Sequence, residues 1–224
     1  DADAALVSVM HSNNETGVLQ PIAELVEFAH AKGAILHTDA AQSVGKVALK
    51  VRELGVDLLS IAGHKLYAPK GVGALYVRRG TPLAPLVLGA GHERGLRPGT
   101  ENVAAIVGLG MVCEIVGDDM ESVARRVADL RNDLWARLAA AVPGIQLNGH
   151  RTLRLPNTLN VRFPRASGNA ILLGTPEIAA STGSACHAAG ESASAVILAM
   201  GVAADDAIGS IRLTLGRGTT SADV

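Results

Sequence analysis

Short apolar runs alternate with polar turns along the first part of the chain. Four runs have the length of buried strands, at residues 6–10, 34–37, 56–61 and 72–77. Between the first two runs, Pro21 opens a segment in which apolar residues repeat at helical spacing as far as Gly33. Strands that alternate with a helix in this way predict an α/β domain, in which sites lie at the carboxyl ends of the strands.

The middle of the chain predicts a loop followed by two helices. Residues 88–100 are rich in glycine and charge, a composition that cannot pack a core. Residues 101–116 predict a helix of small residues, and residues 120–142 predict a longer helix with one apolar and one charged face. We therefore divide the chain into a large α/β domain, residues 1–118, and a smaller domain, residues 119–224.

The smaller domain has an α+β pattern. We expect strands at residues 157–163, 177–181 and 210–215, and a helix at residues 192–200 that Gly201 ends. Residues 219–223 read as the start of a further helix, and the chain begins with Asp1 rather than methionine. We therefore expect this chain to be the middle and most of the C-terminal part of a longer protein, with the final helix missing.

Composition and charge narrow the possible functions. Apolar residues make up 48% of the chain, and the formal net charge of −1 argues against nucleic acid or an anionic membrane as the main partner. No apolar run is long enough to span a bilayer. The two cysteines, Cys113 and Cys186, form neither a disulfide framework nor a zinc pattern, and no metal site is indicated. A reducing, cytoplasmic setting is the best match.

Two residues at expected strand ends suggest cofactor chemistry. Lys65 follows the run 56–61, where partial burial would lower the pKa of its amine and make it a nucleophile that forms a Schiff base. Asp39 lies 26 residues earlier, at the end of another strand. An electron-sink cofactor needs a lysine for the imine and an aspartate for its pyridinium nitrogen. Taken alone, Lys65 would be interpreted as a solvated surface lysine, and Asp39 could equally be a helix-capping aspartate.

Six motifs, in order along nearly the whole chain, resemble those of the cysteine desulfurase family. This family belongs to the class V, aminotransferase-like enzymes that use pyridoxal 5'-phosphate (PLP). The motifs include His11-x-Asn13-Asn14-Glu15-Thr16-Gly17 and Gly63-His64-Lys65-x-Tyr67-x-Pro69-Lys70-Gly71, and the others lie at residues 37–43, 91–100, 183–186 and 211–220. The resemblance implies the PLP-dependent transferase (aspartate aminotransferase-like) fold, with a large α/β domain followed by a smaller α+β domain.

The resemblance also implies a role for each matched residue. Lys65 would carry PLP as a Schiff base, Asp39 would pair with the pyridinium nitrogen, Gln42 would contact the phenolic oxygen, and His64 would contact the phosphate. Thr100 would reach the phosphate of the partner subunit's cofactor, which implies a homodimer. The remaining roles are those of Asn14 and Arg212, which would hold the substrate carboxylate, and of Cys186, which would be the nucleophile. Cys113 lies within the apolar pattern of a helix, and we expect it in the core.

The implied activity is conversion of L-cysteine to L-alanine and an enzyme-bound persulfide, which passes sulfur to an acceptor protein. Iron–sulfur cluster assembly, tRNA thiolation and cofactor biosynthesis all remain open as destinations. The alternatives are a selenocysteine lyase, which residues 97–102 and 185–187 also resemble, another class V enzyme, or a non-enzymatic scaffold.

The chain departs from the family pattern in two respects. Ala62 stands where the family commonly has a serine that binds the phosphate. The family's ring-stacking imidazole and its phosphate loop would both lie N-terminal to this chain. We therefore expect the chain alone to be inactive.

Overall fold

The computed structural model describes residues 3–183 and 193–224. The chain divides into two units, the first within Asp1–His11 and Gln20–Met120 and the second within Ser12–Leu19 and Glu121–Val224, and the described residues of each unit are compact. The proposed nucleophile Cys186 lies outside the described residues. The second unit therefore includes a short segment, Ser12–Leu19, that the sequence pattern assigned to the large domain.

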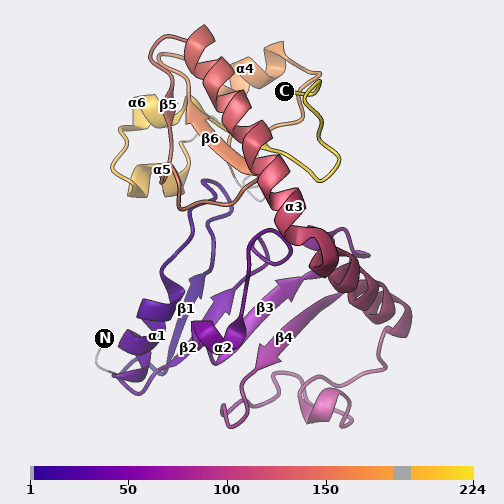
Figure 1. The fold of residues 1–224 in the computed structure, drawn as a ribbon. Coiled ribbons are helices and arrows are strands. Elements are labelled where there is room, and N and C mark those ends of the chain that lie inside the picture. Colours follow the sequence, from indigo (N-terminus) through magenta and orange to yellow (C-terminus); the bar gives the residue numbers. More distant parts are fainter. Residues whose placement is uncertain (1–2, 184–192) are drawn as a thin grey trace. The chain divides into compact units, whose positions relative to one another are not determined.

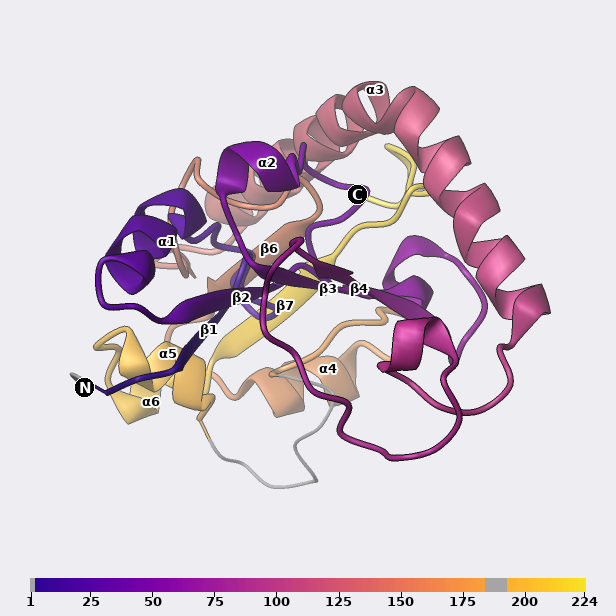
Figure 2. The same cartoon turned by 90° about the horizontal axis from the view of Figure 1, so that it is seen from below.

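The first unit is built on a four-stranded sheet with the order β1-β2-β3-β4 (Figures 1 and 2). Its strands are β1 (Leu6–Met10), β2 (Ile35–Asp39), β3 (Leu58–Ala62) and β4 (Gly73–Val77). The β1–β2 and β2–β3 pairs are parallel, whereas β4 pairs with β3 antiparallel. The sequence-based α/β expectation is thus confirmed for this unit.

Helix α1 (Ile22–His30) forms the core of the first unit with one face of this sheet. Ile22, Val26 and Ala29 are buried against Leu36 of β2 and Leu59 of β3. These helical residues recur every three or four positions, which places them on one stripe of α1. A short helix, α2 (Val51–Leu54), ends at Gly55 in the left-handed conformation, which glycine adopts without steric cost.

A single helix, α3 (Val103–Ala141), replaces the two helices expected from the sequence. It has 39 residues and belongs to the first unit as far as Met120 and to the second unit from Glu121. The break was expected near Gly117, where a glycine costs about 1 kcal/mol relative to alanine but does not end a helix. No proline lies within α3, so the hydrogen-bond ladder can continue through this point.

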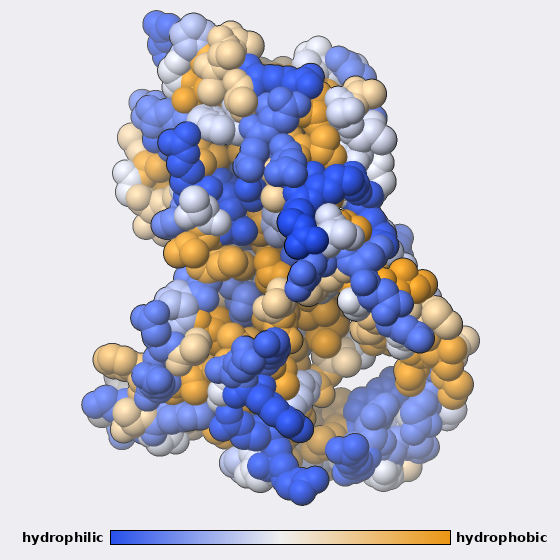
Figure 3. Space-filling model, in the orientation of Figure 1, coloured by the Kyte–Doolittle hydropathy of each residue, from blue (hydrophilic) through white to orange (hydrophobic). Residues whose placement is uncertain are grey.

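Cys113 is exposed, so the expectation that it lies in the core is wrong. The buried stripe of this half of α3 runs through Ala105, Leu109 and Val116, and Cys113 lies to one side of that stripe. Other apolar residues of the same half, such as Val107, are also exposed, and Figure 3 shows hydrophobic residues along it. A segment that is apolar on all sides does not reveal from sequence which face is buried.

The second unit contains a three-stranded antiparallel sheet with the order β5-β6-β7. Its strands are β5 (Gln146–Leu147), β6 (Thr158–Arg162) and β7 (Ser210–Thr214), and its shorter helices are α4 (Gly168–Gly174), α5 (Ala195–Ala199) and α6 (Ala204–Ala207). The expected strand at residues 177–181 is wrong, because only Ser181 forms a bridge, to Arg212. Pro176 and the end of α4 occupy the chain just before it, and Ile178 is exposed rather than buried in a sheet.

Within the residues that the structure describes, no helix combines the length and the apolar character needed to cross a bilayer.

Candidate functional site

The ends of β2 and β3 bring the candidate cofactor residues of the first unit to one edge of the sheet. Asp39 is the last residue of β2 and is the register partner of Ser60 in β3. Directly after β3, a single turn of 3₁₀ helix, Gly63–Leu66, carries His64 and Lys65. Because the two strands are parallel, Asp39 and this turn lie beyond the same edge of the sheet.

Leu66 anchors the turn that carries His64 and Lys65. Leu66 is buried and packs with Leu109 and Val116 of α3. Gly45 lies against the same cluster with a φ of 74°, and a β-carbon added there would lie 2.7 Å from Val116 Cγ1. A side chain at position 45 would therefore displace the packing that fixes the turn.

Asp39 is held at the strand end by its side chain and by its main chain. Its Oδ1 accepts a hydrogen bond from the Ala41 amide at 2.8 Å, a local capping contact of the kind left open by the sequence. Its carbonyl accepts from the His11 amide at 2.8 Å. Asp39 is nevertheless exposed, so a carboxylate is presented at the sheet edge.

Lys46 links two of the expected cofactor residues and was not predicted from the sequence. Its Nζ donates to the carbonyl oxygen of Gln42 at 3.0 Å and to that of Lys65 at 3.4 Å. Burial, together with the nearby charge of Lys65, lowers the pKa of Lys46 to about 8. The main chains of Gln42 and Lys65 are therefore within reach of one ammonium group. A lysine directly after Gly45 gives no local signal of this contact.

Three more of the expected cofactor residues are exposed, and for Lys65 this differs from the predicted setting. Lys65 is exposed rather than half-buried as expected, and His64 is exposed beside it. Thr100 is also exposed, and Arg97 Nη1 donates to the carbonyls of Gly99 at 3.0 Å and Thr100 at 3.3 Å. The contact expected of Thr100 with a partner subunit stays a prediction.

The second unit brings together Asn14 and Arg212, which are 198 residues apart in the sequence. Arg212 lies in β7, and its Nη1 donates to the Asn14 carbonyl oxygen at 3.0 Å. Arg212 is not on an open strand edge, because β6 pairs with one side of β7 and Ser181 bridges to Arg212 on the other. The arginine is thus fixed at its backbone and partly buried.

Comparisons with known proteins show which family this chain is similar to. Cysteine desulfurase 2 of Trichormus variabilis is 46% identical over an alignment of 224 positions that covers 99% of this chain and 56% of that protein. Cysteine desulfurase IscS of Dictyoglomus turgidum is 44% identical over 99% of this chain and 57% of its own length. The chain thus spans about half the length of the curated relatives it matches.

Solved structures of related proteins are also similar to this chain. A NifS-like protein from Rickettsia africae has a TM-score of 0.88 and 32% identity over 97% of this chain and 58% of its own. DndA from Streptomyces lividans has a TM-score of 0.78 and 37% identity over 96% of this chain and 61% of its own. The model of the family described as "Aminotransferase class-V" matches residues 1–224. This chain therefore belongs to the class V aminotransferase family.

Proposed function

We propose that the protein carrying this chain is a PLP-dependent cysteine desulfurase. The observation that carries the proposal is the strand-end cluster, in which Asp39 ends β2 and Lys46 contacts the main chains of both Gln42 and Lys65. These residue types at one sheet edge suit a pyridine cofactor that is held through an imine. The similarity to curated cysteine desulfurases supports the choice of substrate and reaction.

The chemical groups at the sheet edge fit PLP. A primary amine can hold its aldehyde, an exposed carboxylate can pair with its ring nitrogen, and an amide and an imidazole can bond its oxygens. Lys65, Asp39, Gln42 and His64 would supply these groups in that order. When bound, PLP withdraws electrons from the α-carbon of an amino acid. Asp39 favours this by keeping the ring nitrogen protonated, whereas Ala62 offers no hydroxyl to the phosphate.

Asn14 and Arg212 would hold the substrate through its carboxylate. A guanidinium has five N–H donors, so the bond from Arg212 to the Asn14 carbonyl leaves donors for a bidentate contact with a carboxylate. The planar fork of arginine matches the two carboxylate oxygens, which fixes the orientation of the amino acid. This orientation would decide which bonds of the substrate face the reacting groups.

Cys186 would accept the sulfur. Its thiolate attacks the sulfur of the substrate L-cysteine, so that an S–S bond forms as the C–S bond breaks. The product on Cys186 is a persulfide, and protonation of the released carbon gives L-alanine. A sulfur-acceptor protein would then take the persulfide sulfur, and we propose a homodimer, through Thr100, and a cytoplasmic, reducing setting that keeps the thiol free.

The proposal is tested by measuring alanine release from L-cysteine and from L-selenocysteine by the PLP-loaded protein and its Cys186→Ala variant. We expect turnover of L-cysteine by the wild type and none by the variant, whose cofactor absorbance stays unchanged. Borohydride reduction should fix the cofactor at Lys65. Turnover of selenocysteine alone would identify a selenocysteine lyase, and an uncoloured protein that borohydride does not label would favour a scaffold.

A further inference from the structure

Residues 14–17 present four consecutive carbonyl oxygens, and each accepts a hydrogen bond from a residue far along the chain in the same unit. Arg212 Nη1 donates to Asn14 at 3.0 Å, Asn160 Nδ2 to Glu15 at 3.1 Å, Arg154 Nη2 to Thr16 at 2.6 Å, and the Leu155 amide to Gly17 at 2.8 Å. Four consecutive bonds of this kind fix both the position and the orientation of the turn relative to the segments that donate to it.

Side-chain hydrogen bonds, within the turn and from Ser194, hold it as well. Asn13 Oδ1 accepts from the amides of Glu15 and Thr16, each at 2.9 Å, and from the Thr16 hydroxyl at 3.1 Å. The Glu15 carboxylate accepts from the Ser194 hydroxyl at 2.5 Å. Donors and acceptors of the turn are therefore both engaged, and Asn14 is carried on a segment with little freedom to move.

The strand pairing connects this row of bonds to the proposed substrate arginine. Asn160 of β6 is the register partner of Arg212 of β7. Directly opposite residues on antiparallel strands project their side chains to the same face of the sheet. One cross-strand pair thus donates to two neighbouring carbonyls, those of Asn14 and Glu15. A shift at Asn160 would be transmitted to the contact between Asn14 and Arg212.

Arg154 occupies an unusual setting for an arginine. Only 5% of its surface is exposed, and its Nε has no hydrogen-bond partner among the described residues. Burial, and the charge of nearby Arg131, lower the pKa of Arg154 to about 10. Burying this guanidinium costs free energy because it loses its contacts with water. Its short hydrogen bond to the Thr16 carbonyl offsets part of that cost. An apolar side chain would fill the space at lower cost but would not hold that carbonyl.

We propose that Arg154 and Asn160 are positioning residues for the substrate carboxylate, acting by holding the Asn14 turn at a fixed distance from Arg212. The inference rests on the proposed function, in which Asn14 and Arg212 bind that carboxylate. Neither positioning residue touches the substrate. Their effect is confined to ligands that carry a carboxylate.

The test compares Arg154→Met and Asn160→Ala in the PLP-loaded protein, using the change in cofactor absorbance to measure affinity. The two ligands are L-alanine and ethylamine, which is the same amine without the carboxylate. We expect the dissociation constant of L-alanine to rise about tenfold or more, while that of ethylamine stays unchanged. A tenfold rise corresponds to the loss of one buried hydrogen bond of about 1.4 kcal/mol. Arg154→Lys, which keeps a donor and the charge, should recover most of the affinity.

A second readout needs no cofactor. In the apo protein, hydrogen exchange at the amides of residues 15 and 16 should accelerate in both variants, because the turn loosens. Asn157→Ala is the matched control, since Asn157 is also a buried asparagine of the second unit and donates to a main-chain carbonyl outside the turn, that of Leu215 at 3.3 Å. It should lose a similar amount of stability while keeping the preference for L-alanine.

The outcomes separate this inference from the proposed function. If Arg212→Lys weakens L-alanine binding while Arg154→Met and Asn160→Ala do not, the positioning role is overturned and the proposed function stands. If Arg212→Lys also leaves L-alanine binding intact, the carboxylate site is elsewhere, and both the positioning role and the proposed substrate-binding role of Asn14 and Arg212 fail. Equal losses for L-alanine and ethylamine would show a merely structural role for the two residues.

Discussion

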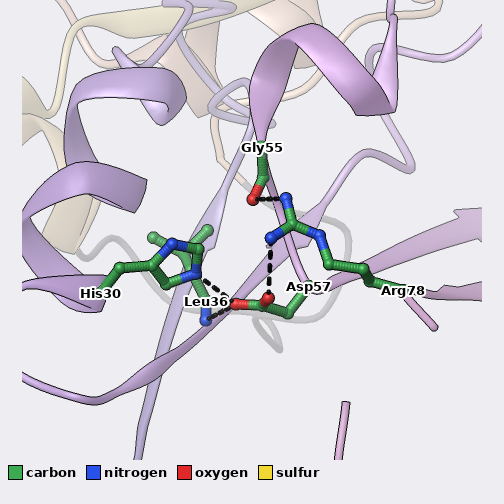
Figure 4. Close-up of polar contacts among 5 residues, drawn as sticks. All are labelled: His30, Leu36, Gly55, Asp57 and Arg78. Atoms are coloured by element: carbon green, nitrogen blue, oxygen red, sulfur yellow. Dashed lines mark hydrogen bonds and ion pairs between the residues drawn. The ribbon is translucent and has the colours of Figure 1, made fainter. Parts of the chain in front are cut away.

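Asp57 joins four segments of the first unit, and its replacement by asparagine should destabilise that unit measurably. The carboxylate accepts hydrogen bonds from the Leu36 amide at 2.9 Å and from His30 Nε2 at 2.7 Å, and it pairs with Arg78 at 3.4 Å (Figure 4). Arg78 in turn donates to the Gly55 carbonyl. The side chain of Asp57 is only 12% exposed, so these contacts are poorly replaced by water.

The expected loss follows from the contacts. A hydrogen bond to a charged group contributes about 1.5–3 kcal/mol, and asparagine keeps one oxygen that can accept from Leu36 but loses the charge. The Arg78 pair adds little, because the Arg78 side chain is 39% exposed and can be hydrated. Asp57→Asn should therefore lower the free energy of unfolding by about 2–3 kcal/mol at pH 7.

The loss should depend on pH in a defined direction. Burial by itself raises the pKa of Asp57, but the bonds from Leu36 and His30 and the charge of Arg78 outweigh burial and hold the pKa below its ordinary 3.8. A lowered pKa in the folded state stabilises the protein above the unfolded-state value and ceases to do so as pH falls through the folded-state value. The difference between wild type and variant should therefore shrink below about pH 3.8.

Urea unfolding followed by circular dichroism, from pH 7 down to pH 3, measures both effects. Glu53→Gln is the control, because the Lys50–Glu53 pair is 68% and 70% exposed and should contribute less than about 0.5 kcal/mol. The reasoning fails if Asp57→Asn costs no more than this control at pH 7. It also fails if the difference stays constant as the pH is lowered.

Three further predictions follow from single residues. Gly17→Ala should lower the free energy of unfolding by about 2–4 kcal/mol, since the φ of Gly17 is 77° and the added carbon would lie 2.8 Å from a β6 side chain. Gly33→Ala, where the added carbon would meet open space, should lower it by only about 1 kcal/mol, and thermal unfolding of the two variants measures the difference. The difference in unfolding free energy between wild type and Lys46→Met should rise from about pH 8 to pH 10.5, because Lys46 is deprotonated in the folded state and protonated in the unfolded state over that range. Urea titrations that find the same difference at every pH would contradict the lowered pKa of Lys46. Asp39→Asn should weaken PLP binding at least about tenfold in absorbance titrations while leaving stability unchanged, because asparagine can still accept from the Ala41 amide; unchanged affinity would leave only the capping role.

Local patterns in the sequence were sufficient for much of the first unit. The apolar run 6–10 became β1 with the same bounds, and the segment that Pro21 opens became α1. These features depend on neighbouring residues, since strand length and helical spacing are local properties. The family motifs are likewise short runs of neighbouring residues, which is why the resemblance depends on the sequence alone.

Tertiary structure decided which residues support the candidate site. The sequence did not single out Lys46, Arg154 or Asn160, because their partners lie up to 145 residues away and no local pattern specifies them. Periodicity shows that a helix has an apolar face, but not which part of it another element covers, so Cys113 was placed wrongly. Hydrogen bonds between distant segments form only after the strands have paired in register, and that register places Asn160 beside Arg212.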